Sequence, residues 1–267
     1  MTDSAAADRP AIDTSVPHSA RIWNYWLGGK NYYEVDRIAG DEYRETFPGI
    51  VDMARASRGF LVRAVTHLAG EAGVRQFLDI GTGLPTADNT HEVAQRVVPE
   101  ARIVYVDNDP LVLAHARALL TSTPEGVTQY IDADVRRPDA ILAQAAQTLD
   151  LDEPVALMLM GILGHIPDYA EARSIVERLL EALPSGSHLV LYDGTDTDEA
   201  LAKAQQNYDE GGSEPYRLRS PEQIAGFFDG LELLDPGVVS TSRWRPEETS
   251  AGLPAEVKTY GGVGRKP

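Results

Sequence analysis

Three aspartates follow short apolar runs in the sequence, a place where a carboxylate can bind a ligand. Asp79 lies within F-L-D-I-G-T-G, Asp107 closes V-Y-V-D, and Asp134 lies in D-A-D-V. If the apolar runs are parallel strands, their carboxyl ends meet at one edge of a sheet, which is where open α/β sheets bind ligands. The spacing therefore predicts that the three carboxylates contribute to one ligand site.

The first motif also carries a glycine turn, formed by Gly81, Thr82 and Gly83. Glycines let the backbone approach a ligand closely, and the N-terminus of a helix that follows directly would add positive potential. The turn alone is weak evidence for a binding site, because many G-x-G turns only connect a strand to a helix.

The acid that precedes the turn discriminates between nucleotide ligands. In a dinucleotide site the position of Asp79 is usually apolar, because a carboxylate there would repel the pyrophosphate. Thr86 stands where the third glycine of G-x-G-x-x-G would be. An acid at this point suits a ligand with positive charge, such as an ammonium or a sulfonium group. These residues favour S-adenosylmethionine over a nicotinamide dinucleotide.

Asp107 and Asp134 each allow a functional and a structural interpretation. Asp107 could accept both hydrogen bonds of a ribose diol. Alternatively it is a solvated loop carboxylate or a helix cap, a role for which Asp109 is better placed. Asp134 could accept a hydrogen bond from the adenine amine while Val135 packs on the ring, or it could belong to an exposed acidic turn.

Five runs of apolar and β-branched residues predict the strands that position these acids. They lie at residues 75–80, 102–107, 127–132, 155–160 and 188–193. Helical patterns separate them, and the pattern after Asp109 has a proline at its first helical position. Alternation of helices with nearly continuous apolar strands is typical of a parallel sheet covered on both faces. We therefore expect a doubly wound α/β fold.

The C-terminal part of the chain departs from this alternation. A helix is expected over residues 198–208, and a second helix is expected to begin at Ser220, where S-P-E-Q matches a capping box. Two further strands are expected at residues 231–240 and 257–264. Because no helical pattern separates these two runs, they should pair antiparallel and close one edge of the sheet.

The N-terminal part is rich in aromatic residues. Five aromatic side chains lie between Trp23 and Tyr33, ahead of any expected core strand. Apolar residues at helical spacing from Ile50 to Leu68 predict a long amphipathic helix that leads into the main domain. We expect three parts, namely a flexible arm over residues 1–17, a helical lid segment over residues 18–70 and a Rossmann-like domain over residues 71–267.

Composition and charge narrow the function classes. The net charge of −17 disfavours nucleic acid and anionic membrane surfaces as partners. Cysteine is absent, which excludes disulfides and thiolate metal sites, and no His, Asp or Glu group has the spacing of metal ligands. Residues 1–19 lack the apolar run of a secretory signal. We expect a cytoplasmic protein without a metal.

The motifs together resemble a known family. D-I-G-T-G, V-Y-V-D-N-D and D-A-D-V resemble the cofactor motifs of class I S-adenosylmethionine-dependent methyltransferases. More narrowly, P-H-S-A-R-I-W-N-Y-W-L-G-G-K-N-Y-Y and M-G-I-L-G-H-I-P-D resemble a bacterial methyltransferase family formerly known only as a domain of unknown function. The resemblance spans the chain from about Pro17 to Gly264. It implies a mostly parallel seven-stranded sheet in the order 3-2-1-4-5-7-6, with the last strand antiparallel.

The resemblance also implies which residues hold the cofactor. Together with the motifs it predicts a set of cofactor-binding residues: Asp79, Gly81, Thr82, Gly83, Asp107, Asn108, Asp134, Val135, Gly161 and Tyr25.

Two residues are candidates for a part in catalysis. His165 could act as a general base toward a methyl acceptor, or it could cap or pack against the helix that begins near Pro167. Asp193 could face the acceptor, or it could begin the turn that follows its strand. The expected substrate-side lid residues are Trp23, Trp26, Lys30, Tyr208, Tyr216 and Arg217.

Two alternatives remain open on these residues. The protein is expected to transfer a methyl group to a small or medium-sized molecule, but a regulator that binds S-adenosylmethionine without catalysis would fit the same cofactor motifs. The aromatic segment could cover the cofactor crevice, where aromatic faces attract a sulfonium by about 0.5–2 kcal/mol. It could instead only pack the N-terminal helix against the domain.

Overall fold

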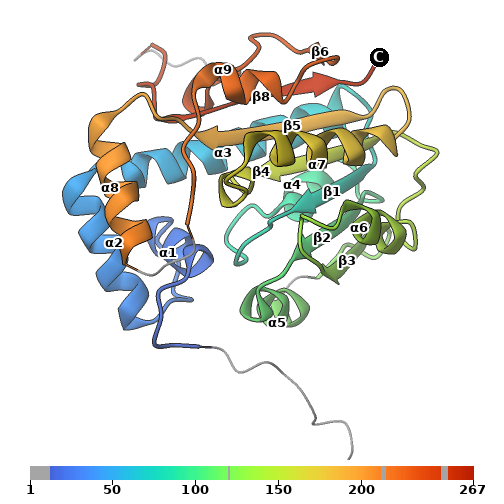
Figure 1. Ribbon diagram of the computed structural model, residues 1–267. Helices are drawn as coiled ribbons and strands as arrows, with labels where there is room; N and C mark the ends of the chain where they lie inside the picture. The colour runs from blue at the N-terminus through green and yellow to red at the C-terminus, as the bar shows by residue number, and fades with distance from the viewer. Residues whose placement is uncertain (1–12, 120, 212–214, 248–251) are drawn as a thin grey trace, which may run out of the picture.

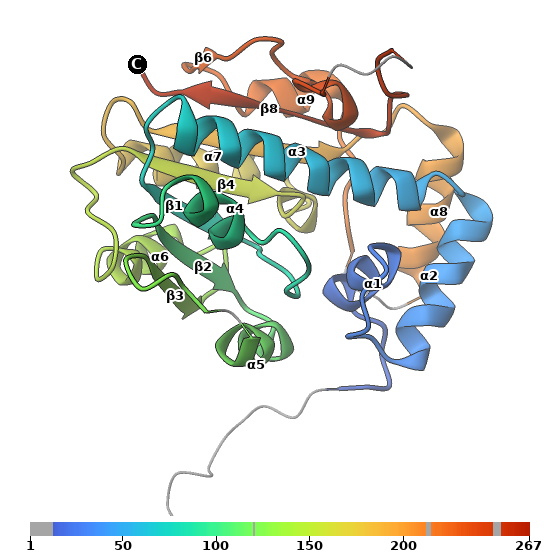
Figure 2. The same cartoon turned by 180° about the vertical axis from the view of Figure 1, so that it is seen from behind.

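The computed structural model describes residues 13–119, 121–211, 215–247 and 252–267, and most of the predicted arm over residues 1–17 lies outside them. A twisted sheet runs through the middle of the molecule. Helices α3 and α4 cover one of its faces, whereas α6 and α7 cover the other (Figures 1 and 2). The predicted doubly wound α/β class is therefore confirmed.

The five predicted core strands are all present, with bounds within one residue of the prediction. They pair in parallel in the order β3-β2-β1-β4-β5, and β8 then pairs antiparallel with β5. The strands are β1 Gln76–Ile80, β2 Arg102–Asp107, β3 Val127–Asp132, β4 Val155–Met160, β5 His188–Gly194 and β8 Thr259–Arg265.

Side chains of the central strands are buried on both faces. In β4, Leu157 and Leu159 belong to the apolar cluster on one side of the sheet, and Ala156 and Met158 belong to the cluster on the other side. Successive side chains of a strand point to opposite faces, so a strand covered on both sides needs an unbroken apolar run. This requirement explains the sequence V-A-L-M-L-M.

The predicted strand over residues 231–240 is divided in two. Short segments β6 (Glu232–Leu233) and β7 (Val239–Ser240) both pair with β8. Pro236 lacks an N–H to donate to a ladder, and Gly237 has a φ of +85°, so the chain leaves the sheet between the two segments. Otherwise the order corresponds to the predicted 3-2-1-4-5-7-6.

The helices follow their predicted start signals with small differences. Asp168 caps α7, which begins two residues after Pro167, and α8 extends past the predicted end at residue 208. Ser220 and Gln223 form the predicted capping box of α9. The helices are α1 Ser19–Trp26, α2 Glu34–Thr46, α3 Ile50–Gly70, α4 Thr90–Val97, α5 Pro110–Leu119, α6 Pro138–Ala145, α7 Tyr169–Glu181, α8 Glu199–Glu210 and α9 Pro221–Gly226, with 3₁₀ turns η1 Leu163–His165 and η2 Thr241–Arg243.

Helices α1, α2 and α8 gather beyond one end of the sheet, together with the start of α3 (Figures 1 and 2). Helix α1 approaches α2 closely at Gly40, where a Cβ atom would lie 2.8 Å from the ring of Tyr25. A buried ion pair between Arg21 Nε and Asp36, at 2.8 Å, joins the two helices. The second half of α3 instead packs on the sheet through residues such as Phe60.

No helix in the described part of the chain is long and apolar enough to cross a membrane.

Candidate functional site

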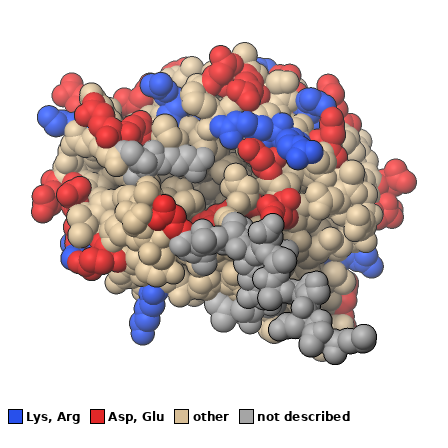
Figure 3. Space-filling model, turned by 60° about the horizontal axis from the view of Figure 1, so that its bottom comes forward, with Lys and Arg blue, Asp and Glu red and all other residues tan. Residues whose placement is uncertain are grey.

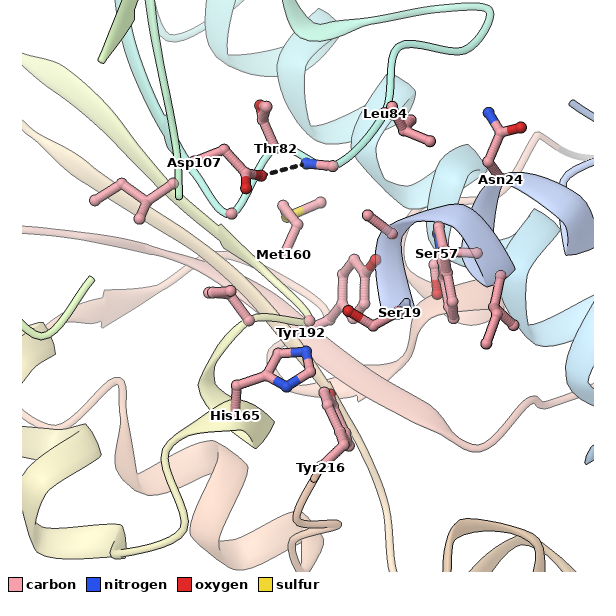
Figure 4. A pocket seen from close by; sticks show the side chains of 18 of the residues that line it. Ser19, Asn24, Ser57, Thr82, Leu84, Asp107, Met160, His165, Tyr192 and Tyr216 are labelled. Atoms are coloured by element: carbon pink, nitrogen blue, oxygen red, sulfur yellow. Dashed lines mark hydrogen bonds between the residues drawn. The ribbon is translucent and has the colours of Figure 1, made fainter. Parts of the chain in front are cut away.

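A cavity of about 240 Å³ opens where the parallel strands end (Figure 4). The carboxyl ends of β1, β2 and β4 form its floor, and the first turns of α1 face them. The cavity continues between α1, α3 and α8. The sheet edge predicted from the three aspartates is therefore the edge at which the cavity lies.

Asp79 lies on the floor of this cavity and is 4% exposed. Thr90 Oγ1 donates to its carboxylate at 2.6 Å. Burial raises the pKa of Asp79 from 3.8 to about 6, although the Thr90 hydrogen bond opposes the rise. Within the described residues Asp79 forms no direct ion pair, but the positive charge of Arg58 nearby also acts to lower its pKa. A buried carboxylate without an ion-pair partner in this part of the chain is chemically suited to a cationic ligand.

Asp107 holds the glycine turn while facing the cavity. One carboxylate oxygen accepts from Gly83 N at 2.9 Å and the other from Asp109 N at 2.9 Å (Figure 4). Burial raises its pKa. Each oxygen has a second lone pair, so the carboxylate can still accept the two hydrogen bonds of a diol.

The glycine turn is longer than predicted. Helix α4 begins at Thr90 rather than directly after Gly83, because residues 81–89 form a loop that ends in the Asn89 capping box. Gly81 has a φ of +75°, and a Cβ atom there would lie 2.6 Å from Ile162. This position therefore requires glycine, as the sequence motif indicated.

The other predicted cofactor residues occupy two groups. Asp134 lines the cavity at the end of β3, and its carboxylate caps Arg136 N at 2.9 Å. The cavity lining also includes Thr82, Asn108, Val135 and Gly161. Tyr25 lies outside that lining. Its hydroxyl donates to Asp41 at 2.6 Å and its ring packs on Tyr32.

His165 lies at the end of η1 with its imidazole pointing into the cavity (Figure 4). Its Nδ1 lies 3.0 Å from the carbonyl oxygen of Pro215. A carbonyl can only accept, so Nδ1 carries the proton and Nε2 carries the lone pair in the neutral ring. The ring of Tyr216 packs edge-on at 5.1 Å. The contacts with Pro215 O and with the Tyr216 ring hold the imidazole of His165 at the cavity wall.

Asp193 lies behind the cavity wall and is fully buried. It accepts from the Tyr216 hydroxyl and forms an ion pair with Arg219 at 3.0 Å. Burial raises the pKa of Asp193, whereas Arg219 opposes that rise. Asp193 therefore positions Tyr216, whose ring lines the cavity, and does not reach the lining itself.

The predicted lid residues separate into two sets. Trp23, Trp26, Tyr208 and Tyr216 line the cavity. Two others, Lys30 and Arg217, are exposed outside its lining.

Several lining residues on α3 and β5 belong to none of the sequence motifs. Met53, Ser57 and Leu61 recur every four residues on one face of α3, and Arg58 follows Ser57. This spacing was a usable signal, because a helix face of mixed polar and apolar residues indicates more than core packing. Tyr192 lies at the carboxyl end of β5, the edge already assigned to the ligand.

A parallel α/β sheet with a cavity at the carboxyl ends of its strands is typical of proteins that bind nucleotides or related nucleoside ligands. The sequence matches the S-adenosyl methyltransferase family over residues 5–267. The chain therefore belongs to this family.

Solved structures agree with the family assignment. A DUF574 family protein from Streptomyces avermitilis is 46% identical with a TM-score of 0.91, covering 96% of this chain and 99% of that one. A Thermobifida fusca protein with a provisional methyltransferase name is 42% identical, and its structure has a TM-score of 0.87. The match covers 95% of this chain and 96% of that one.

A curated relative is a Mycobacterium sp. (strain KMS) protein with a provisional S-adenosyl-L-methionine-dependent methyltransferase name. It is 30% identical over 127 residues, which are 46% of this chain and 39% of the relative. The match thus spans about two fifths of that relative's length.

Proposed function

We propose that the protein transfers the methyl group of S-adenosylmethionine to a small or medium-sized acceptor bound in the same cavity. The observation that carries this proposal is the convergence of Asp79, Asp107 and Asp134 on one cavity that continues beneath α1. The acidic strand ends provide a place for the cofactor, and the space bounded by α1, α3 and α8 provides a place for the acceptor.

The three acids have distinct binding roles in this proposal. Asp79 binds the amino group of the cofactor, which compensates its buried negative charge. Asp107 accepts from the ribose hydroxyls while it keeps Gly83 in place. Asp134 accepts from the adenine amine, and Val135 packs beside the ring.

The remaining lining supports transfer by position and by exclusion of water. The cofactor supplies an activated methyl group on sulfur when it is bound. Methyl transfer is an in-line displacement, so the protein must align acceptor and methyl group and keep bulk water out. Trp23 and Trp26 of α1 cover the cavity opposite the strand ends, and their rings suit both tasks.

Calorimetry with S-adenosylmethionine and S-adenosylhomocysteine tests the proposal. Both ligands should bind to the wild-type protein, and no binding at about 1 mM ligand would contradict it. Turnover is then measured with a cell extract as the source of acceptors. Release of S-adenosylhomocysteine is the expected result, whereas binding without release would indicate a regulator that does not catalyse.

A further inference from the structure

Arg58 lines the cavity from α3, a helix that carries none of the cofactor motifs. This helix passes over the loop that joins β1 to α4 (Figure 2), and Arg58 Nη1 donates to Asp88 O of that loop at 3.4 Å. The distance is long for a hydrogen bond, and no other hydrogen bond joins Arg58 to the described residues. Most of the N–H donors of this guanidinium are therefore available to a ligand in the cavity.

The second arginine of the cavity lining already has partners in the protein. Arg136 Nη1 lies 3.5 Å from the Asp134 carboxylate, and Arg136 Nη2 donates to His165 O at 2.8 Å. Arg58, in contrast, forms no ion pair with any residue that the structure describes. Of the two lining arginines, Arg58 is therefore the one whose positive charge lacks a carboxylate partner in this part of the chain.

Arg58 and Asp79 line the same cavity and influence each other without a direct ion pair. Burial raises the pKa of Asp79 to about 6, and the positive charge of Arg58 is one of the influences that oppose the rise. The carboxylate itself is bonded to Thr90 Oγ1 rather than to the guanidinium. A cavity with an anion and a cation that do not neutralise each other directly is suited to a ligand that carries both charges.

The N-terminus of α4, where a glycine turn would usually direct an anion, is already occupied by protein groups. The Asn89 side chain accepts from the backbone of the first helical turn. The Glu92 carboxylate accepts from Asn89 N at 2.8 Å and from Asn89 Nδ2 at 3.1 Å, which places a negative charge at the positive end of the helix dipole. An anionic group of a ligand therefore needs a different partner, and Arg58 provides one on the opposite side of the loop.

We propose that Arg58 binds the carboxylate of the S-adenosylmethionine amino-acid group while Asp79 binds the amino group of the same moiety. This inference rests on the proposed methyltransferase function and adds the residue that recognises the carboxylate. Charges then alternate from the guanidinium through the carboxylate and the ammonium to Asp79, so each has a neighbour of opposite sign. Holding both groups fixes the amino-acid end of the cofactor, and with it the direction in which the sulfur presents its methyl group.

Two ligands that differ only in the carboxylate test the proposal: S-adenosylhomocysteine and decarboxylated S-adenosylhomocysteine. Calorimetry is performed on the full chain at pH 7.5, where Asp79 is ionised. We expect the wild-type protein to bind S-adenosylhomocysteine roughly tenfold or more tightly than the decarboxylated ligand, because only the former makes charge-assisted hydrogen bonds to Arg58. Equal affinities would overturn the inference and leave the proposed function intact. Failure of S-adenosylhomocysteine to bind at all would instead contradict the proposed function.

Substitution of Arg58 shows whether this residue is the source of the preference. Arg58→Gln should weaken S-adenosylhomocysteine binding roughly tenfold or more, because the positive charge is lost. Binding of the decarboxylated ligand should stay the same or become tighter, since its ammonium group no longer meets the repulsion of Arg58. Arg58→Lys keeps the charge without the paired donors and should show an intermediate preference.

The matched control is Arg55→Gln, an exposed arginine on the same helix and outside the cavity lining. It should bind both ligands as the wild-type protein does. Urea unfolding of each variant shows whether the fold is retained. An Arg58→Gln protein that loses affinity for both ligands equally would show that Arg58 only supports the structure, and this result would overturn the inference.

Discussion

Asp79 combines a cost to stability with a benefit to ligand binding. It is buried, and its pKa is raised from 3.8 to about 6 because burial disfavours the charged form. Between these two values the folded protein binds more protons at this site than the unfolded chain does. The contribution of Asp79 to stability therefore decreases as the pH rises from about 4 to about 6. Above that window the ligand-free protein carries a buried negative charge.

Asp79→Asn is expected to stabilise the ligand-free protein and to weaken cofactor binding. The amide oxygen can still accept from Thr90, but the buried charge is removed, so stability at pH 7.5 should increase by about 1–3 kcal/mol. Urea unfolding and calorimetry with S-adenosylhomocysteine measure the two effects. The matched control is Asp132→Asn, an exposed acid at the end of β3. A less stable Asp79→Asn protein with normal affinity would contradict the expectation.

Cofactor affinity should depend on pH through the same carboxylate. The ionised form of Asp79 binds the amino group, so affinity for S-adenosylhomocysteine should be about tenfold lower at pH 5 than at pH 7.5. Calorimetry across this range, repeated with Asp79→Asn, measures the effect. If the variant shows the same pH dependence, another group is responsible.

Asp107 is expected to contribute to binding through the ribose. Asp107→Ala should weaken S-adenosylhomocysteine binding by about 1–3 kcal/mol, because ribose hydroxyls would lose their acceptor and the Gly83 turn would lose its anchor. Asp132→Ala provides the matched control at the neighbouring strand end. Equal affinity of the two variants would argue against the ribose role.

Helix α1 has two faces with different tasks. Trp26 is 8% exposed and packs on Tyr43, whereas Trp23 is only partly buried. Both line the cavity, so the helix packs on its neighbours and also forms part of the cavity wall. His18 Nδ1, just before α1, lies 3.3 Å from the carboxylate of Asp109, just before α5, so this contact links α1 to the loop that follows β2.

The two tryptophans should therefore respond differently to truncation. Trp26→Ala is expected to lower the free energy of unfolding by about 3–5 kcal/mol through loss of buried ring contacts. Trp23→Ala should cost less stability and should weaken S-adenosylmethionine binding by about 0.5–2 kcal/mol through loss of an aromatic face near the sulfonium. Urea unfolding and calorimetry compare the variants directly. A common loss of stability with unchanged affinity would show that α1 is only a packing element.

The whole molecule is strongly acidic, with a net charge of −17. Figure 3 shows acidic side chains spread around a face that is hollowed near its centre, with fewer basic side chains between them. A surface of this kind repels phosphate backbones over distances set by the salt concentration.

This charge leads to an expectation about nucleic acid. We expect no binding to a short DNA duplex even at about 10 mM salt, where electrostatic attraction acts over the longest range. An electrophoretic mobility shift experiment measures it, with a basic DNA-binding protein as the positive control. A salt-sensitive shift would reveal a local basic surface that the net charge conceals.

Much of the fold follows from local signals. Continuous apolar runs predict β1 to β5, since a strand buried on both faces cannot tolerate polar residues. The separation of β6 from β7 does not follow from the apolar pattern, because apolar residues lie on both sides of the break. It depends on Pro236, which cannot donate to the strand ladder. The strand ends and the edge rule for open sheets are sufficient to bring Asp79, Asp107 and Asp134 to one site.

Side-chain direction could not be obtained in the same way. The sequence W-N-Y-W contains no reason to separate Trp23 and Trp26 from Tyr25, yet the tyrosine bonds to Asp41 and the tryptophans line the cavity. Which face of an aromatic helix meets a ligand depends on its neighbours, here Gly40 of α2 and residues of α8. These neighbours are distant in sequence, and no local spacing encodes their contacts.

The primary structure alone determined the α/β class, the acidic strand ends and the preference for a cationic nucleoside ligand, because each depends on residues that are close in sequence. The cavity beneath α1, the contact of His165 with Pro215 and the burial of Asp193 depend on segments that meet only after folding. Pro215 is 50 residues from His165, and Arg219 is 26 residues from Asp193. Their contacts exist because the chain returns to the sheet edge after α8, and this return is a property of the complete fold.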